Sequence, residues 1–179
     1  MATDTLNQLL GTGTLALQVV TIGLIVALLL RKKIPGLNDV INQVGNVALP
    51  VAFVFTLVSA ALTLYYSEVL GFEPCPLCWW QRIFLYPQCI LFALALWKRI
   101  SVRLISIVLS MFGIGFALYH HALQMLPAGS LPCPATGPSC SQITLLEYGY
   151  ITYPLMAGTV FAFLIVLMLA HKVRSQSAL

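Results

Sequence analysis

Two cysteines and an arginine stand close together in the segment Glu73–Arg82, which reads EPCPLCWWQR. Cys75 and Cys78 have C-x-x-C spacing, and an apolar run begins directly after them. At the start of a helix, free backbone N–H groups and the helix dipole favour a thiolate on Cys78. Arg82 follows one helical turn later on the same face, where it either adds positive charge or extends to the membrane interface. Because a stabilised thiolate is a good leaving group and nucleophile, the segment predicts a reactive disulfide.

A second pair, Cys133 and Cys140, lies in the segment LPCPATGPSC, whose prolines and glycine favour turns. A bridge here would close a small ring and stabilise the fold by about 2–3 kcal/mol in the chain-entropy model. Three interpretations remain open: two structural disulfides, a tetrahedral zinc site of four cysteines, or two disulfides that exchange. Covalent haem is excluded, because Trp79 stands where that motif requires histidine.

The composition indicates an all-α integral membrane protein. Of the 179 residues, 60% are hydrophobic and 8% charged, and the mean hydropathy is +0.95. Soluble domains average about 25% charged residues. The net charge of +4 gives no nucleic-acid signal, because the basic residues flank apolar runs. Five runs are long enough to cross a bilayer, which takes about 20 residues. They are Gly11–Leu30, Asn46–Tyr66, Trp79–Trp97, Leu104–Gln124 and Ile151–Ala170.

The first apolar run is interpreted as a retained helix and not as a secretory signal, because its basic residues follow the apolar core. Between the first two runs, Ile34–Gly45 is expected to be a cytoplasmic linker with a short surface helix. We therefore expect two units. Residues 1–45 form an additional N-terminal transmembrane helix with its linker, and residues 46–179 form a four-helix transmembrane bundle that carries the cysteines.

The basic residues predict the orientation of the chain. If the five runs alternate in direction, all but one of the nine Lys and Arg residues share one side. They are Arg31, Lys32, Lys33, Lys98, Arg99, Arg103, Lys172 and Arg174. Because basic residues mark the cytoplasmic side, the N-terminus is expected outside and the C-terminus inside. Both cysteine pairs then face the oxidising side, where disulfides persist.

The fifth cysteine, Cys89, lies 11 residues beyond Cys78, which is about 16 Å further along a helix. We expect it to pack as a small hydrophobe. The two outer pairs suggest a relay in which one disulfide is reoxidised by the other. The sequence carries no FAD, haem or metal signature, so a lipid-soluble quinone is the acceptor that suits the location.

Three segments resemble the DsbB family of quinone-linked disulfide-forming membrane proteins. CPLCWWQRIFLYP, Cys75–Pro87, is similar to the first redox motif of the family and looks most like its short-loop BdbC branch. YHHALQ, Tyr119–Gln124, is similar to the end of the next helix, and CSQITLLEYGYITYP, Cys140–Pro154, to the second motif. The similarity extends from Asn46 to Lys172.

The resemblance implies a membrane disulfide oxidoreductase of the bacterial plasma (inner) membrane. Such a protein reoxidises an extracytoplasmic thioredoxin-fold oxidase, DsbA-like or BdbD-like, and passes the electrons to ubiquinone or menaquinone. By positional match, Cys133 and Cys140 form the disulfide that exchanges with the partner. Cys75 and Cys78 would then reoxidise this pair through a transient bridge between the loops.

The resemblance also implies a quinone site. Cys78 would be the thiolate that faces the quinone, Arg82 would polarise a quinone oxygen, and His121 would lie nearby. No metal site is assigned. Two features depart from the family: the additional N-terminal span, and a gap of only six residues between Cys133 and Cys140, which would restrict the swing of Cys133.

Two alternatives remain beside this interpretation. A vitamin K epoxide reductase-like enzyme shares the four-helix core, the quinone chemistry and two cysteine pairs, but its C-x-x-C lies late in the chain. A non-enzymatic membrane scaffold with structural disulfides, or with a zinc site of four cysteines, would contain bound metal or stable bridges and would have no oxidase activity.

Overall fold

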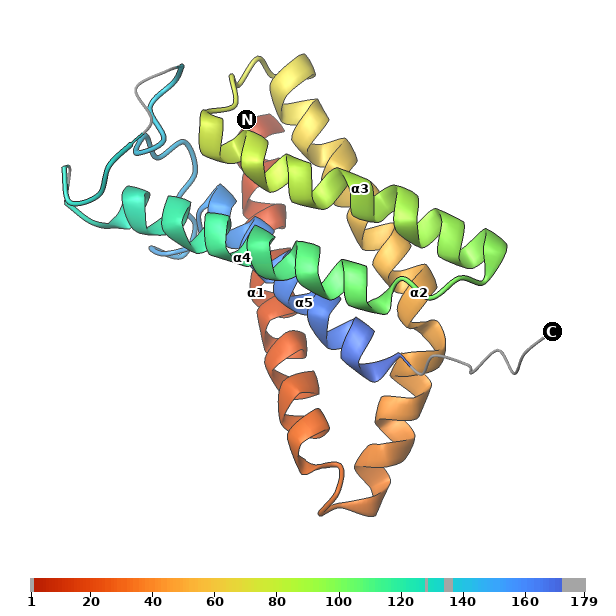
Figure 1. Ribbon diagram of the computed structural model, residues 1–179. Helices are drawn as coiled ribbons and strands as arrows, with labels where there is room; N and C mark the ends of the chain where they lie inside the picture. The colour runs from red at the N-terminus through yellow and green to blue at the C-terminus, as the bar shows by residue number, and fades with distance from the viewer. Residues whose placement is uncertain (1, 128, 134–136, 172–179) are drawn as a thin grey trace.

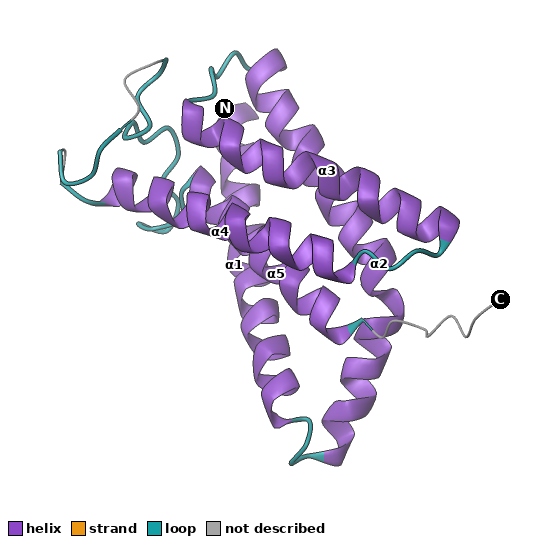
Figure 2. Cartoon of the chain, in the orientation of Figure 1, coloured by secondary structure: helices purple, strands orange, loops and turns teal. Residues whose placement is uncertain are grey.

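The computed structural model describes residues 2–127, 129–133 and 137–171, and this part of the chain is almost entirely helical (Figure 1). The elements are α1 (Ala2–Leu30), α2 (Pro35–Leu64), the π-helical segment η1 (Tyr65–Val69), α3 (Pro76–Lys98), α4 (Arg103–Met125) and α5 (Tyr153–Ala170). Figure 2 shows only helices and loops, so the predicted all-α fold is confirmed for the described residues. Lys172 and Arg174 lie outside the described residues.

Prolines mark the start of three helices. Pro35 and Pro76 are the first residues of α2 and α3, and Pro154 is the second residue of α5. Proline suits the first turn, because the backbone N–H that it lacks would have no intrahelical partner there. Cys75 directly precedes α3 in an extended conformation, with φ −69° and ψ 166°. The C-x-x-C segment is therefore positioned by a helix start that the sequence encodes.

Four helical stretches are long and apolar enough to cross a membrane. They are Thr3–Leu30, Pro35–Val69, Arg103–Met125 and Tyr153–Ala170. The third predicted span, α3, is not among them, because Gln81, Arg82 and Gln88 lower its hydropathy. These three side chains are buried against other parts of the protein. Their polarity thus does not meet lipid. The chain is a multi-pass membrane protein, and the crossing of α3 stays a prediction.

A buried polar cluster joins α3 to α4. Ser106 Oγ donates to Gln88 Oε1 at 2.7 Å, and Gln88 Nε2 donates to Ser110 Oγ at 3.2 Å. All three side chains are fully buried. Hydrogen bonds of this kind hold helices together where lipid offers no alternative partner. The cluster fixes the rotation of α3 relative to α4, the two helices that carry the site.

The helix α5 lies at the centre of the bundle and packs against each of the other four α-helices (Figure 1). Phe161 and Leu164 are among its fully buried core residues. The approach of α4 is close at Gly113, where an added Cβ would fall 2.5–2.7 Å from the Phe161 ring. Small residues allow such backbone contact between membrane helices. The position of α4 therefore depends on α5.

The linker differs from its prediction. In place of a separate short helix, residues from Pro35 onward form the first turns of α2, which continues unbroken to Leu64. This segment is helical because it has a buried side. Ile41 packs in a small core with the ends of α1 and α5, and the Gly45 carbonyl lies 3.0 Å from His171 Nδ1. Only a short turn, residues 31–34, joins α1 to α2.

Between Asn7 and Gln18, the additional helix α1 forms hydrogen bonds with four tyrosines, Tyr66, Tyr148, Tyr150 and Tyr153. Asn7 Oδ1 accepts hydrogen bonds from Tyr66 at 2.5 Å and from Tyr153 at 3.2 Å. Further along α1, Gln18 Oε1 accepts from the Tyr150 hydroxyl at 2.9 Å. Tyr150 and Tyr153 belong to the segment that follows the second cysteine pair. The helix α1 thus braces this segment against the bundle.

Candidate active site

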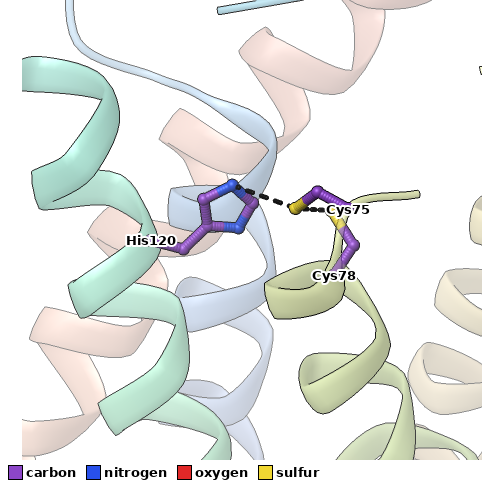
Figure 3. Close-up of side chains that lie close together, drawn as sticks. All are labelled: Cys75, Cys78 and His120. Atoms are coloured by element: carbon purple, nitrogen blue, oxygen red, sulfur yellow. Dashed lines mark hydrogen bonds between the residues drawn. The ribbon is translucent and has the colours of Figure 1, made fainter. Parts of the chain in front are cut away.

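The C-x-x-C pair lies at the N-terminus of α3. Cys75 is the residue before the helix, Cys78 lies in its first turn, and the Cys75 carbonyl accepts from the backbone N–H of Trp79 at 3.2 Å. The Cys75 thiol donates to Cys78 Sγ at 3.4 Å (Figure 3). Cys75 is buried and Cys78 is half-buried. The helix start therefore holds both sulfurs together and leaves Cys78 the more accessible.

The second pair lies in the loop that follows α4. The backbone N–H of Cys140 donates to Cys133 Sγ at 3.3 Å, so the two cysteines adjoin although the residues between them, 134–136, lie outside the described residues. Cys140 is 1% exposed, whereas Cys133 is half-buried. In each pair, one sulfur is buried and the other is accessible.

The end of α4 anchors both flanks of this loop. The Tyr119 hydroxyl donates to the Pro132 carbonyl at 2.6 Å, next to the first cysteine of the loop. The Gln124 amide donates to the Gln142 carbonyl at 3.1 Å, two residues beyond Cys140. These contacts direct the loop back onto α3 and α4.

The two pairs meet through their buried sulfurs. Cys75, Leu77 and Cys140 are buried members of one packed cluster, and Cys78 and Cys133 pack against it. Within this sulfur cluster, the Cys75 thiol donates to Cys78. Cysteines from motifs far apart in the sequence are therefore close enough to exchange disulfides.

Hydrogen bonding and burial keep two of these thiols protonated. The bond that Cys75 donates to Cys78 is the largest cause that raises the pKa of Cys75 to about 11, and burial adds to it. Burial is the largest cause that raises the pKa of Cys140 to about 12. Because the thiolate is the nucleophile, attack from either buried sulfur requires that the thiol first lose its proton.

His120, from α4, closes the cluster. Its Nε2 lies 3.7 Å from Cys75 Sγ and 3.1 Å from the Cys140 carbonyl oxygen. Gln81 Nε2 donates to His120 Nδ1 at 3.0 Å, so the imidazole proton lies on Nε2 and points to the Cys140 carbonyl. The ring is 2% exposed. One buried imidazole therefore contacts both cysteine motifs.

Two residues singled out from the sequence lie away from this cluster. His121, the residue proposed to lie near a quinone, has its Nδ1 2.9 Å from the Thr152 hydroxyl, at the N-terminus of α5. Cys89 is half-buried in the middle of α3 and is not part of the sulfur cluster within the described residues. The neighbouring residues His120 and His121 thus make different contacts.

Arg82 is buried, and its guanidinium reaches α2. Its Nη2 donates to the Thr63 carbonyl at 2.9 Å, and its central carbon lies 5.1 Å from the centre of the Trp79 ring. The Thr63 hydroxyl lies in turn 2.9 Å from the Tyr86 hydroxyl. Since the guanidinium has five N–H groups, this one bond leaves donors that another acceptor could use.

An open apolar groove lies beside the sulfurs, between α3 and α4. It has a volume of about 280 Å³ and is lined by Leu77, Met111, Phe112, Gly115, Phe116 and Tyr119. The Trp80 ring stacks on Phe116 with centroids 5.1 Å apart and planes at 6°. Leu77 adjoins Cys78 in sequence, and Tyr119 adjoins His120. The groove can therefore accept a flat apolar molecule close to the thiols.

The comparisons with known proteins agree with this geometry. The family model for Disulfide bond formation protein DsbB matches residues 45–171, more than half of the chain. This chain belongs to the DsbB family. The family match favours the first interpretation of the sequence over the vitamin K epoxide reductase-like one.

Individual relatives carry the same family description. The chain is 41% identical over 101 residues to the SPbeta prophage-derived disulfide bond formation protein B of Bacillus subtilis, which covers 56% of this chain and 68% of the relative. It is 31% identical over 134 residues to a probable disulfide formation protein of Chlamydia trachomatis, which covers 74% of this chain and 98% of the relative. No solved structure matches the chain.

Membership of the DsbB family gives the activity in its general form. This family forms disulfide bonds, so the chain is a thiol oxidoreductase, and its apolar helices make it a multi-pass membrane protein. The individual roles of the cysteines, the electron acceptor and the partner are matters of proposal.

Sequence reasoning gave His120 little weight, although one signal pointed to it. The buried positions of α4 recur every three or four residues. They are Ser106, Ser110, Gly113, Ala117, His120 and Leu123. A helix face with this spacing packs against its neighbours. His120 falls on that face and His121 does not, so the pattern of small residues distinguishes the two.

Proposed function

We propose that this chain reoxidises a thioredoxin-fold thiol oxidase outside the cytoplasm and passes the electrons through its two cysteine pairs to a membrane quinone. The observation that carries the proposal is the packing of both cysteine pairs in one cluster, within which the Cys75 thiol donates to Cys78. Two purely structural disulfides would not need to be in contact with each other.

The proposed electron transfer has three balanced steps. First, a dithiol of the partner reduces the Cys133–Cys140 disulfide and becomes a disulfide itself. Second, the resulting Cys133 and Cys140 thiols reduce the Cys75–Cys78 disulfide and are reoxidised. Third, the Cys75 and Cys78 thiols form their disulfide again and give two electrons and two protons to the quinone, which becomes a quinol.

The accessible and buried sulfurs suit different steps. Cys133 is the more exposed member of the loop pair, so the mixed disulfide with a protein partner is assigned to it. Cys140 packs in the same buried cluster as Cys75, so a bridge between them needs only a small movement. The short spacing of the loop pair, which suggested restricted motion, is thus compatible with a transient Cys75–Cys140 disulfide.

The groove between α3 and α4 is proposed to receive the quinone ring. Its apolar lining and the stacked rings of Trp80 and Phe116 suit a flat aromatic head group. Cys78 borders it through Leu77 and would be the sulfur that faces the quinone. Arg82 has N–H groups left to polarise a quinone oxygen, and His121 remains a proposed neighbour of the quinone.

The proposed location of the cysteines is the non-cytoplasmic side of a bacterial plasma membrane. The argument is the positive-inside rule applied to Arg31–Lys33 and Lys98–Arg103, which follow α1 and α3. The cysteines stand at the opposite helix ends, before α3 and after α4. A partner of the DsbA or BdbD type would meet them there.

The proposal is tested with the purified chain, a reduced thioredoxin-fold partner and ubiquinone or menaquinone. We expect loss of quinone absorbance in step with loss of partner thiols, at one quinone per disulfide formed. Cys78→Ser should stop quinone reduction, and Cys89→Ala should leave it close to the wild-type rate. A wild-type chain that forms no partner disulfide and consumes no quinone would favour the scaffold alternative.

A further inference from the structure

The C-x-x-C sulfurs and one histidine nitrogen form a compact set of metal-binding atoms. Cys75 Sγ, Cys78 Sγ and a ring nitrogen of His120 all lie within 4.8 Å of one another. Cys75 Sγ lies 3.4 Å from Cys78 Sγ and 3.7 Å from His120 Nε2. Figure 3 shows the edge of the imidazole turned toward the Cys75 sulfur. In tetrahedral zinc sites, bonds of about 2.3 Å to sulfur and 2.0 Å to nitrogen set neighbouring donors roughly 3.5–3.8 Å apart.

We propose that the reduced form of this chain binds Zn²⁺ through Cys75, Cys78 and His120. Thiolate and imidazole are donors that Zn²⁺ prefers, and two of the three separations are already close to the tetrahedral value. Binding releases one proton from each thiol and transfers no electrons, so the cysteines stay reduced. The fourth position adjoins Cys140, which packs in the same buried cluster as Cys75.

This donor set differs from the four-cysteine site that the cysteine count suggested. Cys133 is not part of it, and a histidine that sequence reasoning set aside supplies the nitrogen. The distinction can be tested, because a site of four cysteines requires Cys133 and does not require His120.

Gln81 gives His120 the outer partner that a zinc-bound histidine needs. The Gln81 amide lies 3.0 Å from His120 Nδ1, and both side chains are buried. A metal at Nε2 requires the ring proton on Nδ1, and Gln81 Oε1 can accept its hydrogen bond once the amide rotates. Such an outer partner fixes the ring and the tautomer of a metal-binding histidine.

Zinc binding at this site depends on the redox state. A Cys75–Cys78 disulfide has no thiolate to offer, so only the reduced pair can hold the metal. Bound zinc would in turn keep the pair reduced and prevent its return to the disulfide. The inference concerns these side chains alone and requires neither the proposed quinone nor the proposed partner.

The test is a direct binding measurement on the full-length chain in detergent, with no activity readout. The reduced protein is freed of reductant and titrated with Zn²⁺ in competition with a chromophoric zinc chelator. We expect one equivalent to bind to the reduced chain and none to the oxidised chain. His120→Ala should weaken binding by roughly a hundredfold, and Gln81→Leu by about tenfold. The matched controls His121→Ala and Cys133→Ser should keep the wild-type affinity.

Wild-type affinity in His120→Ala, equal binding by the oxidised chain, or loss of binding in Cys133→Ser would each overturn the proposal. Should His120→Ala fail to fold, Co²⁺ added to the reduced wild-type chain decides. Tetrahedral d–d absorption with a thiolate charge-transfer band supports the site, and an octahedral spectrum without that band overturns it. Because quinone reduction is not measured, failure of this inference and failure of the proposed function are distinguishable.

Discussion

The two cysteine pairs are held by different kinds of backbone. Cys75 and Cys78 sit on the first turn of α3, where a proline start and a backbone hydrogen bond fix the geometry. Cys133 and Cys140 sit in an irregular loop that is tied to α4 on its two flanks. The first pair packs in one cluster with Leu77, Phe116 and Tyr119, which line an apolar groove, and the second pair lies in the loop between α4 and α5.

This difference explains how one chain can serve two unlike reactants. A pair on a helix end presents its sulfurs in fixed positions beside an apolar surface, which suits a small molecule dissolved in lipid. A pair in a loop can present one sulfur to a protein surface. His120 contacts both Cys75 and the backbone of Cys140, so the two regions remain coupled. Several variants test whether the two cysteine pairs have separate roles.

The largest effect is expected from removing one sulfur of each pair. Cys78→Ser should abolish quinone reduction and yet allow one equivalent of partner to be oxidised, because the loop disulfide remains. Cys133→Ser should abolish partner oxidation and yet allow a small dithiol to reduce quinone through Cys75 and Cys78. Single-turnover measurements of partner thiols and quinone absorbance check both results.

Cys89→Ala, which should behave as the wild type in both measurements, is the control. If Cys78→Ser and Cys133→Ser lose the same half-reaction, the two pairs do not have separate roles. One pair would then not serve the quinone while the other serves the partner.

A smaller effect is expected for alkylation within each pair. A pKa raised to about 11 for Cys75 and to about 12 for Cys140 leaves little thiolate on either at pH 8. Because the thiolate is the reactive form and both sulfurs are buried, Cys78 and Cys133 should be alkylated roughly tenfold faster or more than their partners. Iodoacetamide labelling of the reduced chain, followed by peptide mass spectrometry, measures the order. Labelling of Cys75 before Cys78 would refute the direction of the hydrogen bond from Cys75 to Cys78.

Helix α4 contacts both cysteine pairs, and its position can be tested by a substitution at Gly113. Gly113→Ala places a Cβ against the Phe161 ring and should displace α4, at a cost of about 1–3 kcal/mol in stability. Gly115→Ala, two residues away, meets nothing within 4 Å and is the matched control. Unfolding of both variants by a denaturing detergent gives the difference. Equal stability of the two would show that α4 and α5 pack less closely than described.

The smallest effect is expected at Gln124. Gln124→Ala removes one hydrogen bond to the loop, worth about 0.5–1.5 kcal/mol. It also removes the Gln124 Oε1 atom, which is buried without a partner among the described residues, so the net change should be less. Hydrogen exchange should speed up around Gln142 and stay unchanged in the first turn of α3. Equal acceleration in both places would mean that the loop and the helix start open together.

The sequence predicted the helices because its signals are local. Apolar runs, the prolines at Pro35, Pro76 and Pro154, and the basic residues between runs mark the elements without reference to other parts of the chain. The helix expected in the linker is present, but it continues into α2 and is not a separate surface helix, because Pro35–Gly45 has contacts with the ends of α1 and α5. Such contacts are not visible in a local pattern.

The residue types of the site could be predicted from the sequence, but the contacts between these residues were harder to predict. The C-x-x-C spacing gave the first pair directly, but the meeting of Cys140 with Cys75 depends on how the loop folds back. Neighbouring residues on a helix point about 100° apart. Whether His120 or His121 reaches the thiols is thus decided by the rotation of α4. That rotation is set by Gly113 and the buried contacts with α3 and α5.

The central claim is that the two pairs meet at Cys75 and Cys140, and a disulfide trap tests it most directly. In a Cys78→Ser/Cys133→Ser double variant, Cys75, Cys140 and Cys89 are the only cysteines left. On mild oxidation with diamide, peptide mass spectrometry should find a Cys75–Cys140 disulfide in most molecules. Free thiols at both positions, or a disulfide that involves Cys89 instead, would contradict the account.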